Sequence, residues 1–210
     1  MASGVMAAAT IYNESTNIFM DAKKKAKIAG KMLGCALALS YPFETQSITL
    51  VGFSLGTQVI KSCLKTLHSL GALSRGQNSI IQNVVFMGGA INFDGLGKEV
   101  KWKKILGSTV AGSIANVFST KDYVLLGYQL THDGKKSAGR SELPFEAERE
   151  ELFASSMPTI HSCDILNFRN INITLMVNAE DEGHLVQKKQ GHLNYRKDNM
   201  AKILNLLSFY

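Results

Sequence analysis

The sequence predicts an α/β fold with a mainly parallel sheet flanked by helices. Short runs rich in β-branched residues recur along the chain, and segments with apolar residues at helical spacing separate them. Composition agrees, since 45% of the 210 residues are hydrophobic and 19% are charged, which allows a sizeable core and excludes a disordered chain. We expect a single domain over residues 1–210.

The first expected element is an amphipathic helix over residues 21–39. Its lysines avoid the apolar positions, which recur at three- and four-residue steps: Ala22, Ala26, Ala29, Leu33, Ala36 and Leu37. Gly30 and Gly34 each weaken a helix by about 1 kcal/mol relative to alanine. Their presence therefore indicates close packing of this helix against another element.

Strands and helices alternate from there on. The β-prone run at 47–53 precedes a helical pattern that begins at Gly56 and stops before Gly71. Further strands are predicted at 83–87, 114–119 and 171–177, and further helices at 144–153 and along the C-terminal stripe of Met200, Ile203, Leu204 and Leu207. The polar residues 125–157 are interpreted as either a lid or a solvated excursion.

Charge and cysteine content narrow the function classes. Lys and Arg (23) exceed Asp and Glu (17) by six, an excess that solvated lysines explain, so no nucleic-acid partner is expected. Three scattered cysteines, Cys35, Cys63 and Cys163, fit a reducing intracellular compartment better than a disulfide framework. His161 and Cys163 are close in sequence, but a zinc site needs three or four ligands, so neither a metal nor a cofactor is expected.

Residues 1–12 are apolar and uncharged. They lack the basic region of a secretory signal and the roughly 20 apolar residues of a spanning helix, and no other segment reaches that length. No transmembrane helix is therefore expected in this chain.

The clearest chemical motif is Gly52-Phe53-Ser54-Leu55-Gly56, between a β-prone run and an amphipathic helix. This Gly-x-Ser-x-Gly pattern is typical of a nucleophile elbow, where a serine sits on a sharp strand-to-helix turn and the glycines let strand and helix approach. The pentapeptide alone is weak evidence for an elbow. Its position between a β-prone run and an amphipathic helix strengthens that evidence. At the helix N-terminus, the Leu55 N–H is an expected oxyanion donor.

A nucleophilic serine needs a base and an acid that orients the base, and on this fold the acid and then the histidine follow the serine. Asp122 comes directly after the run at 114–119, which predicts a place at the carboxyl end of the sheet, beside the elbow. A helix cap or turn residue is the alternative interpretation. Two histidines follow the last predicted strand, and placement favours His192, just ahead of the terminal helix, over His184 in an acidic loop.

Several segments together resemble the DUF726 family of α/β-hydrolase-like proteins, which includes the transmembrane and coiled-coil domain protein 4 group and a yeast membrane-associated lipase. The segments are DAKKKAKIAGKMLGCALAL from Asp21, SITLVGFSLGTQVIKSCL from Ser47, NVVFMGGA from Asn83, NVFSTKDYVL from Asn116 and GHLNY from Gly191. The resemblance implies Ser54 as nucleophile, Asp122 as acid and His192 as base.

The resemblance also implies an N-terminally truncated member, because the family usually carries a longer N-terminal region. Only 46 residues precede the elbow strand, so we expect an α/β-hydrolase-like sheet without its early strands and with an exposed edge. The loop that supplies the second oxyanion donor is not visible upstream.

Two functions from different classes follow. The first is a serine hydrolase acting on a carboxylic ester or lipid-like substrate through Ser54, Asp122 and His192. The second is a catalytically impaired hydrolase fold that serves as a membrane-associated or interaction module.

Membrane association, implied by the resemblance, would be peripheral here. Lysines on the helix at 21–39, together with Lys98, Lys101, Lys103 and Lys104 beside Trp102, are candidates to meet anionic lipid. The alternative is that these lysines are ordinary solvated side chains and that Trp102 packs in the core.

Overall fold

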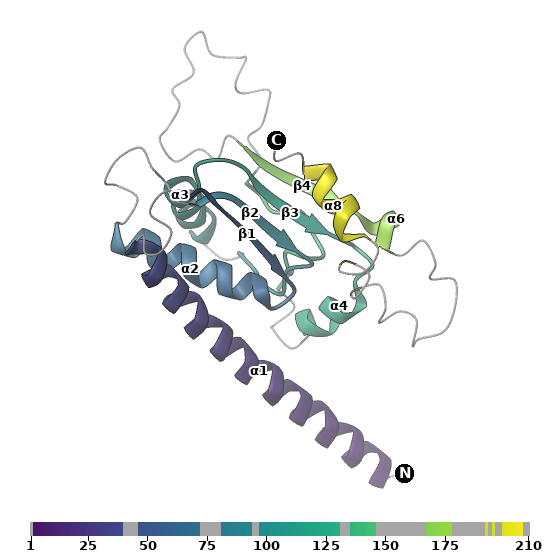
Figure 1. The fold of residues 1–210 in the computed structure, drawn as a ribbon. Coiled ribbons are helices and arrows are strands. Elements are labelled where there is room, and N and C mark those ends of the chain that lie inside the picture. The colour runs from purple at the N-terminus through teal and green to yellow at the C-terminus, as the bar shows by residue number, and fades with distance from the viewer. Residues whose placement is uncertain are drawn as a thin grey trace.

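The computed structural model describes residues 2–39, 46–71, 81–93, 97–130, 135–145, 167–177, 192, 195 and 199–207. Within them, four parallel strands form one sheet in the order β1-β2-β3-β4 (Figure 1). The strands are β1 (Ile48–Phe53), β2 (Ile81–Met87), β3 (Ile114–Phe118) and β4 (Phe168–Asn172). The predicted parallel α/β architecture is confirmed, and all four carboxyl ends lie at the same end of the sheet.

Strand β1 lies at one edge of the sheet. Among the described residues it pairs with β2 alone, and Val51 on it is 45% exposed. The described part of the sheet therefore has the open edge that the sequence predicts.

The last strand is shorter and earlier than predicted. The sequence favours a strand at 171–177, but β4 ends at Asn172 and the next residues form the short helix α6 (Thr174–Val177). The Asn172 side chain accepts hydrogen bonds from the backbone N–H and the hydroxyl of Thr174, at 3.0 and 2.6 Å. This side-chain cap starts a helical turn in a sequence that looks β-prone.

The helices are α1 (Ala2–Ala38), α2 (Gly56–Leu70), α3 (Lys98–Thr109), α4 (Tyr123–Leu130), α6 and α8 (Met200–Leu207). Helix α1 begins far before the predicted residue 21. Helix α2 ends as predicted, with Gly71 in the left-handed conformation at φ 61°. Helices α3 and α4 were not predicted, and the predicted helix at 144–153 lies largely outside the described residues.

Helices cover both faces of the sheet. Alternate strand residues point to opposite sides, so Val84 and Phe86 pack with α1, α2 and α3, whereas Val85 and Met87 pack with α6 and α8. Trp102 of α3 is only 7% exposed and belongs to the first of these cores. Of the two expectations for Trp102, packing in the core is therefore the one that the structure confirms.

Helix α1 packs on α2 through its two glycines. A Cβ at Gly30 would collide with the carbonyl oxygen of Val59 and lie 2.6 Å from the Ser62 Cβ, and one at Gly34 would lie 2.8 Å from the Thr66 Cβ. This confirms the predicted close packing. Ala29 and Ala36 were expected on the buried face but are exposed, because the glycine stripe rather than the full set of alanines faces α2.

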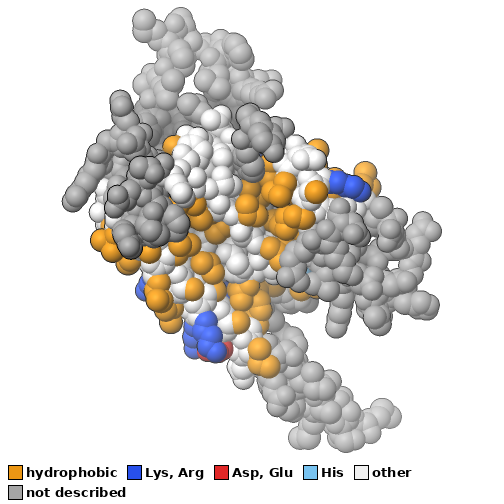
Figure 2. Space-filling view, viewed as in Figure 1, with side chains coloured by type: hydrophobic (Ala, Val, Ile, Leu, Met, Phe, Trp, Pro, Cys, Tyr) orange, Lys and Arg blue, Asp and Glu red, His pale blue; other side chains and the backbone are white. Residues whose placement is uncertain are grey.

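The outer side of α1 carries apolar side chains, visible in orange along the described part of the helix in Figure 2. Its exposed large hydrophobic residues are Ile18, Met20, Ile28 and Met32, and Leu39 directly after its end is also exposed. No helix within the described residues is both long and apolar enough to cross a membrane.

Candidate functional site

Ser54 sits on a strained turn between β1 and α2. Its φ is +51°, which makes it the non-glycine residue with a positive φ in the described part of the chain; such a conformation typically costs about 1–3 kcal/mol. Backbone contacts hold it there, because the Ser54 N–H donates to the Met87 carbonyl at 2.9 Å and the Ser54 carbonyl accepts from the Ala90 N–H at 3.1 Å. The Thr57 hydroxyl also donates to the Ser54 carbonyl, at 2.5 Å.

The two elbow glycines have different roles. A Cβ at Gly52 would lie 2.7 Å from Ile60 Cδ1 and 3.0 Å from the Thr57 backbone nitrogen, so Gly52 is required for the close approach of β1 and α2. A Cβ at Gly56 would meet nothing within 4 Å. The expectation that both glycines relieve a clash is therefore correct for Gly52 and wrong for Gly56, because Gly56 faces open space.

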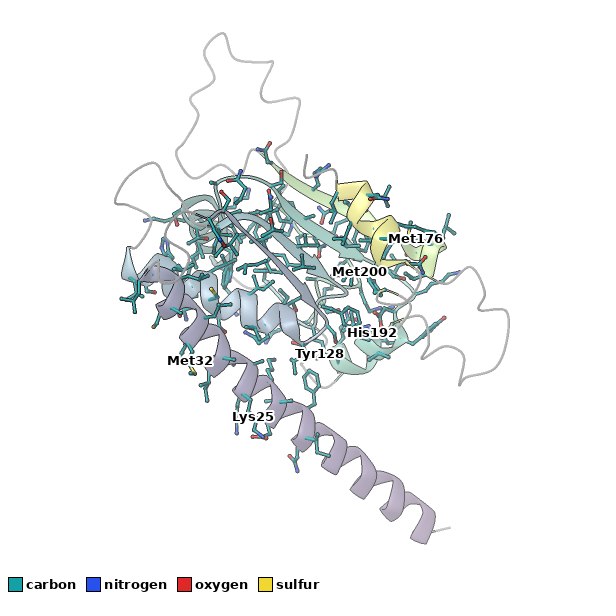
Figure 3. All side chains as sticks on the ribbon, viewed as in Figure 1. Lys25, Met32, Tyr128, Met176, His192 and Met200 are labelled. Atoms are coloured by element: carbon teal, nitrogen blue, oxygen red, sulfur yellow. The ribbon has the colours of Figure 1, made fainter. Side chains whose placement is uncertain are left out.

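Residues far apart in the chain meet at Ser54. His192 Nε2 lies 2.9 Å from Ser54 Oγ, and His192 Nδ1 lies 2.6 Å from Asp122 Oδ2. His192 lies at the carboxyl end of the sheet, beside α4 (Figure 3). The structure thus brings together Ser54, Asp122 and His192, whereas His184 lies outside the described residues.

The arrangement fixes the roles of the two ring nitrogens. An ionised carboxylate only accepts hydrogen bonds, so Nδ1–H of His192 donates to Asp122. The other nitrogen, Nε2, then carries a lone pair and accepts from the Ser54 hydroxyl. This is the tautomer that a general base needs.

Asp122 makes two contacts, one as a helix cap and one with His192. Its Oδ1 accepts from the Leu125 N–H at 3.0 Å, which caps the start of α4, while Oδ2 accepts from His192. The carboxyl group is buried, with the residue 1% exposed. The helix cap therefore holds the acid in place for its contact with the histidine.

Aromatic rings surround the histidine. The Phe53 ring lies 4.8 Å from the His192 ring between centroids, and the Tyr195 ring lies 6.1 Å away. Burial, and secondarily the charge of Asp122, raises the pKa of the Tyr195 hydroxyl. These apolar walls limit water access to the acid–histidine contact.

Leu55 occupies the N-cap position of α2. Among the hydrogen bonds of the described residues, none is donated by its N–H. That donor lies one residue after Ser54, which is where an oxyanion donor is expected on an elbow.

Sequence reasoning missed Arg140, which braces the loop that carries Asp122. Arg140 donates to the Thr120 carbonyl at 2.7 Å and to Gln129 Oε1 at 3.0 Å. Nearby, the Ser119 N–H donates to the Gly139 carbonyl at 3.0 Å. A single arginine in a polar stretch carries no sequence signal for such a role, because its partners are set by the fold.

The described residues contain no group of three or more His, Cys, Asp or Glu side chains arranged to hold a metal ion. His161 and Cys163 lie outside the described part of the chain.

Comparison with known proteins places the chain in a family. The family described as "Protein of unknown function (DUF726)" matches residues 5–210. The chain belongs to DUF726. No solved structure matches it.

Two curated relatives of the chain have names that mention membranes. The chain is 28% identical over 175 residues to the transmembrane and coiled-coil domain-containing protein STS1 of Oryza sativa, covering 83% of this chain and 22% of that protein. It is 33% identical over 124 residues to the uncharacterized membrane protein C6F6.13c of Schizosaccharomyces pombe, covering 59% of this chain and 20% of that protein. The chain thus spans about a fifth of the length of these relatives.

Proposed function

We propose that this DUF726 chain is a serine hydrolase domain that cleaves a carboxylic ester. The observation that carries the proposal is the hydrogen-bonded series Ser54–His192–Asp122, with contacts of 2.9 and 2.6 Å. A serine and a histidine alone would be weak support, but here the serine also occupies a strained elbow and the histidine has a buried acid behind it.

The proposed reaction has two halves. Ser54 Oγ attacks the ester carbonyl carbon while its proton moves to His192 Nε2, and the leaving alcohol takes that proton as the ester bond breaks. Water then attacks the acyl group on Ser54 and gives a proton to His192, and His192 returns that proton to Ser54 Oγ as the acyl–serine bond breaks and the carboxylic acid leaves. Asp122 stabilises the imidazolium that forms, and the Leu55 N–H donates to the oxyanion.

A lipid-like ester is the substrate class that we propose. Its support is indirect: the relatives named above are membrane proteins by name, and a domain beside a membrane meets lipid esters. We propose a membrane-associated domain on the same ground.

A fluorophosphonate probe tests the chemistry, because Ser54 Oγ would form a bond to phosphorus as fluoride leaves. We expect labelling of the 210-residue chain and its complete loss in Ser54→Ala. Esterase activity on a p-nitrophenyl acyl ester should be lost in the same variant.

Ser108→Ala is the matched control. Ser108 Oγ also lies 2.7 Å from a histidine nitrogen, His68 Nδ1, but its hydroxyl donates to the Ile105 carbonyl at 3.1 Å and sits on no elbow. Labelling should persist in this variant. A folded parent chain that takes up no probe and cleaves no ester overturns the hydrolase proposal and leaves the non-catalytic module.

A further inference from the structure

Lysines from three helices line an open cavity of about 730 Å³. Helices α1 and α2 supply most of its walls, and the other described lining residues are Lys98 and Trp102 of α3, Tyr128 of α4, and Asn92. We call this cavity the lysine groove. Its lysines are Lys23, Lys27, Lys31, Lys61, Lys65 and Lys98. Neither Ser54, Asp122 nor His192 is among the lining residues, so the groove is separate from the candidate active site.

The charged side chains among the described residues that line the groove are all lysines. No aspartate or glutamate is among its described lining residues. The lysine–carboxylate pairs recorded between described residues are Lys25–Asp21 and Lys103–Glu99, and neither lysine lines the groove. Asp21 of α1 and Glu99 of α3 thus pair with lysines outside the groove.

Packing brings the positive charges together. Gly30 and Gly34 let α1 approach α2 closely, so Lys27 and Lys31 of α1 and Lys61 and Lys65 of α2 border one cavity. Each of these pairs is spaced by four residues, which places its two members on one side of their helix.

Two of the lysines are held in place by their surroundings. The Lys61 ammonium donates to the Asn92 carbonyl and lies over the Phe93 and Trp102 rings, 4.6 and 4.9 Å from their centroids. The Lys23 ammonium donates to the Tyr128 hydroxyl at 3.2 Å, and Tyr128, labelled in Figure 3, reaches toward α1 from α4.

Lys23 also shows that the positive charges oppose one another. Burial chiefly lowers the pKa of its ammonium, and the charges of Lys27 and Lys135 lower it further. An anion in the groove would offset this repulsion.

We propose that the lysine groove binds a compact anion with several phosphate groups, either a free inositol phosphate or the headgroup of a phosphoinositide lipid. Lysine ammonium groups bind phosphate as mobile point charges, without the fixed planar geometry of arginine. The cavity volume lies within the range of about 300–1,000 Å³ of small-molecule sites. A compact ligand therefore fits it better than a nucleic-acid duplex.

The first test is titration of the 210-residue chain with inositol hexakisphosphate. Trp102 is the one tryptophan of the chain and lines the groove, so its fluorescence should change and saturate. Sodium sulfate at equal ionic strength should give no saturating change.

Two triple variants that lose the same number of positive charges distinguish anion binding in the groove from nonspecific electrostatic attraction to the whole chain. The groove triple removes three exposed lysines of the groove: Lys27→Gln, Lys31→Gln and Lys65→Gln. It should weaken binding of inositol hexakisphosphate about tenfold or more. The control triple removes three exposed lysines outside the groove: Lys24→Gln, Lys101→Gln and Lys104→Gln. It should change the affinity for inositol hexakisphosphate less than about twofold. Equal losses in both variants overturn the proposal.

Vesicles separate the two sources of phosphate. Phosphatidylcholine vesicles containing phosphatidylinositol bisphosphate should co-sediment the parent and the control triple but not the groove triple if the lipid is the ligand. Groove-dependent binding of inositol hexakisphosphate without vesicle binding identifies the free anion. The proposal is overturned if neither inositol hexakisphosphate nor the phosphoinositide vesicles bind. It is also overturned if polyglutamate, an anion without phosphate, binds and the two phosphate probes do not. Both outcomes are independent of the result at Ser54.

Discussion

The candidate active site and the lysine groove are built in opposite ways. At the site, one acid, one histidine and one serine are held by short hydrogen bonds, and Asp122 and His192 are 1% and 6% exposed. In the groove, lysines such as Lys27, Lys31 and Lys65 are exposed at the surface of two packed helices. Catalysis needs atoms at fixed positions and paired charges, whereas anion binding needs several like charges on side chains that can adapt to the ligand.

Asp122→Asn should produce the largest difference between the two regions, because it should slow labelling at Ser54 and leave anion binding in the groove unchanged. Asparagine keeps an acceptor for the Leu125 N–H but favours the wrong histidine tautomer, so fluorophosphonate labelling should slow about 10⁴-fold. Binding of inositol hexakisphosphate should be unchanged, because Asp122 does not line the groove. Labelling within about tenfold of the parent rate would show that Asp122 acts only as a helix cap.

Gly52→Ala should damage the elbow through the backbone. The added methyl would meet Ile60 and the Thr57 nitrogen, so we expect a loss of about 1–3 kcal/mol in the free energy of unfolding, measured with urea. Gly56→Ala is the control, since its methyl meets nothing within 4 Å, and it should be neutral or stabilising by up to about 1 kcal/mol. Similar costs at both positions would contradict the assigned roles.

Gly30→Ala should disturb the lysine groove rather than the candidate active site. Its methyl collides with the Val59 carbonyl and the Ser62 side chain of α2, so α1 should shift, with about 1–3 kcal/mol lost. Anion binding should weaken more than the rate of labelling at Ser54. Gly127→Ala, a helical glycine of α4 with open space around it, should leave both unchanged, and anion binding that survives Gly30→Ala would refute a groove formed by α1 and α2.

Salt should give the smallest but most selective effect. Raising the ionic strength from low to physiological values should weaken anion binding by on the order of tenfold, because the groove charges are exposed and screened. The rate of fluorophosphonate labelling should change less than about twofold, since the contacts at His192 are buried and short. Salt-independent anion binding would mean that the lysines do not carry it.

Local sequence signals predicted much of the fold, and the misses have physical causes. The runs at 47–53 and 114–119 match strands closely because most of their residues are apolar or β-branched. Helix α3 was missed although its buried residues Trp102, Ile105, Leu106 and Thr109 have helical spacing, since lysines dominate the segment. Helix α4 begins with apolar residues in succession, a pattern that does not distinguish helix from strand.

The chemical groups of the candidate site can be recognised from the order of residues along the chain. A serine between glycines after a β run, an acid after a later run and a histidine before the last helix are all visible in order, because parallel strands bring their carboxyl ends to one edge. Sequence placement also favoured His192 over His184, and His192 is the histidine hydrogen-bonded to Ser54.

Only the tertiary structure decided the contacts that depend on packing between distant segments. Arg140 braces the Asp122 loop, Tyr195 and Phe53 border His192, and lysines on α1 and α2 face one cavity. Periodicity tells which side of a helix a residue occupies, but the partner of that side depends on how helices and loops pack together. For the groove, the deciding step is the approach of α1 to α2 at Gly30 and Gly34, which turns separate lysine stripes into one positively charged surface.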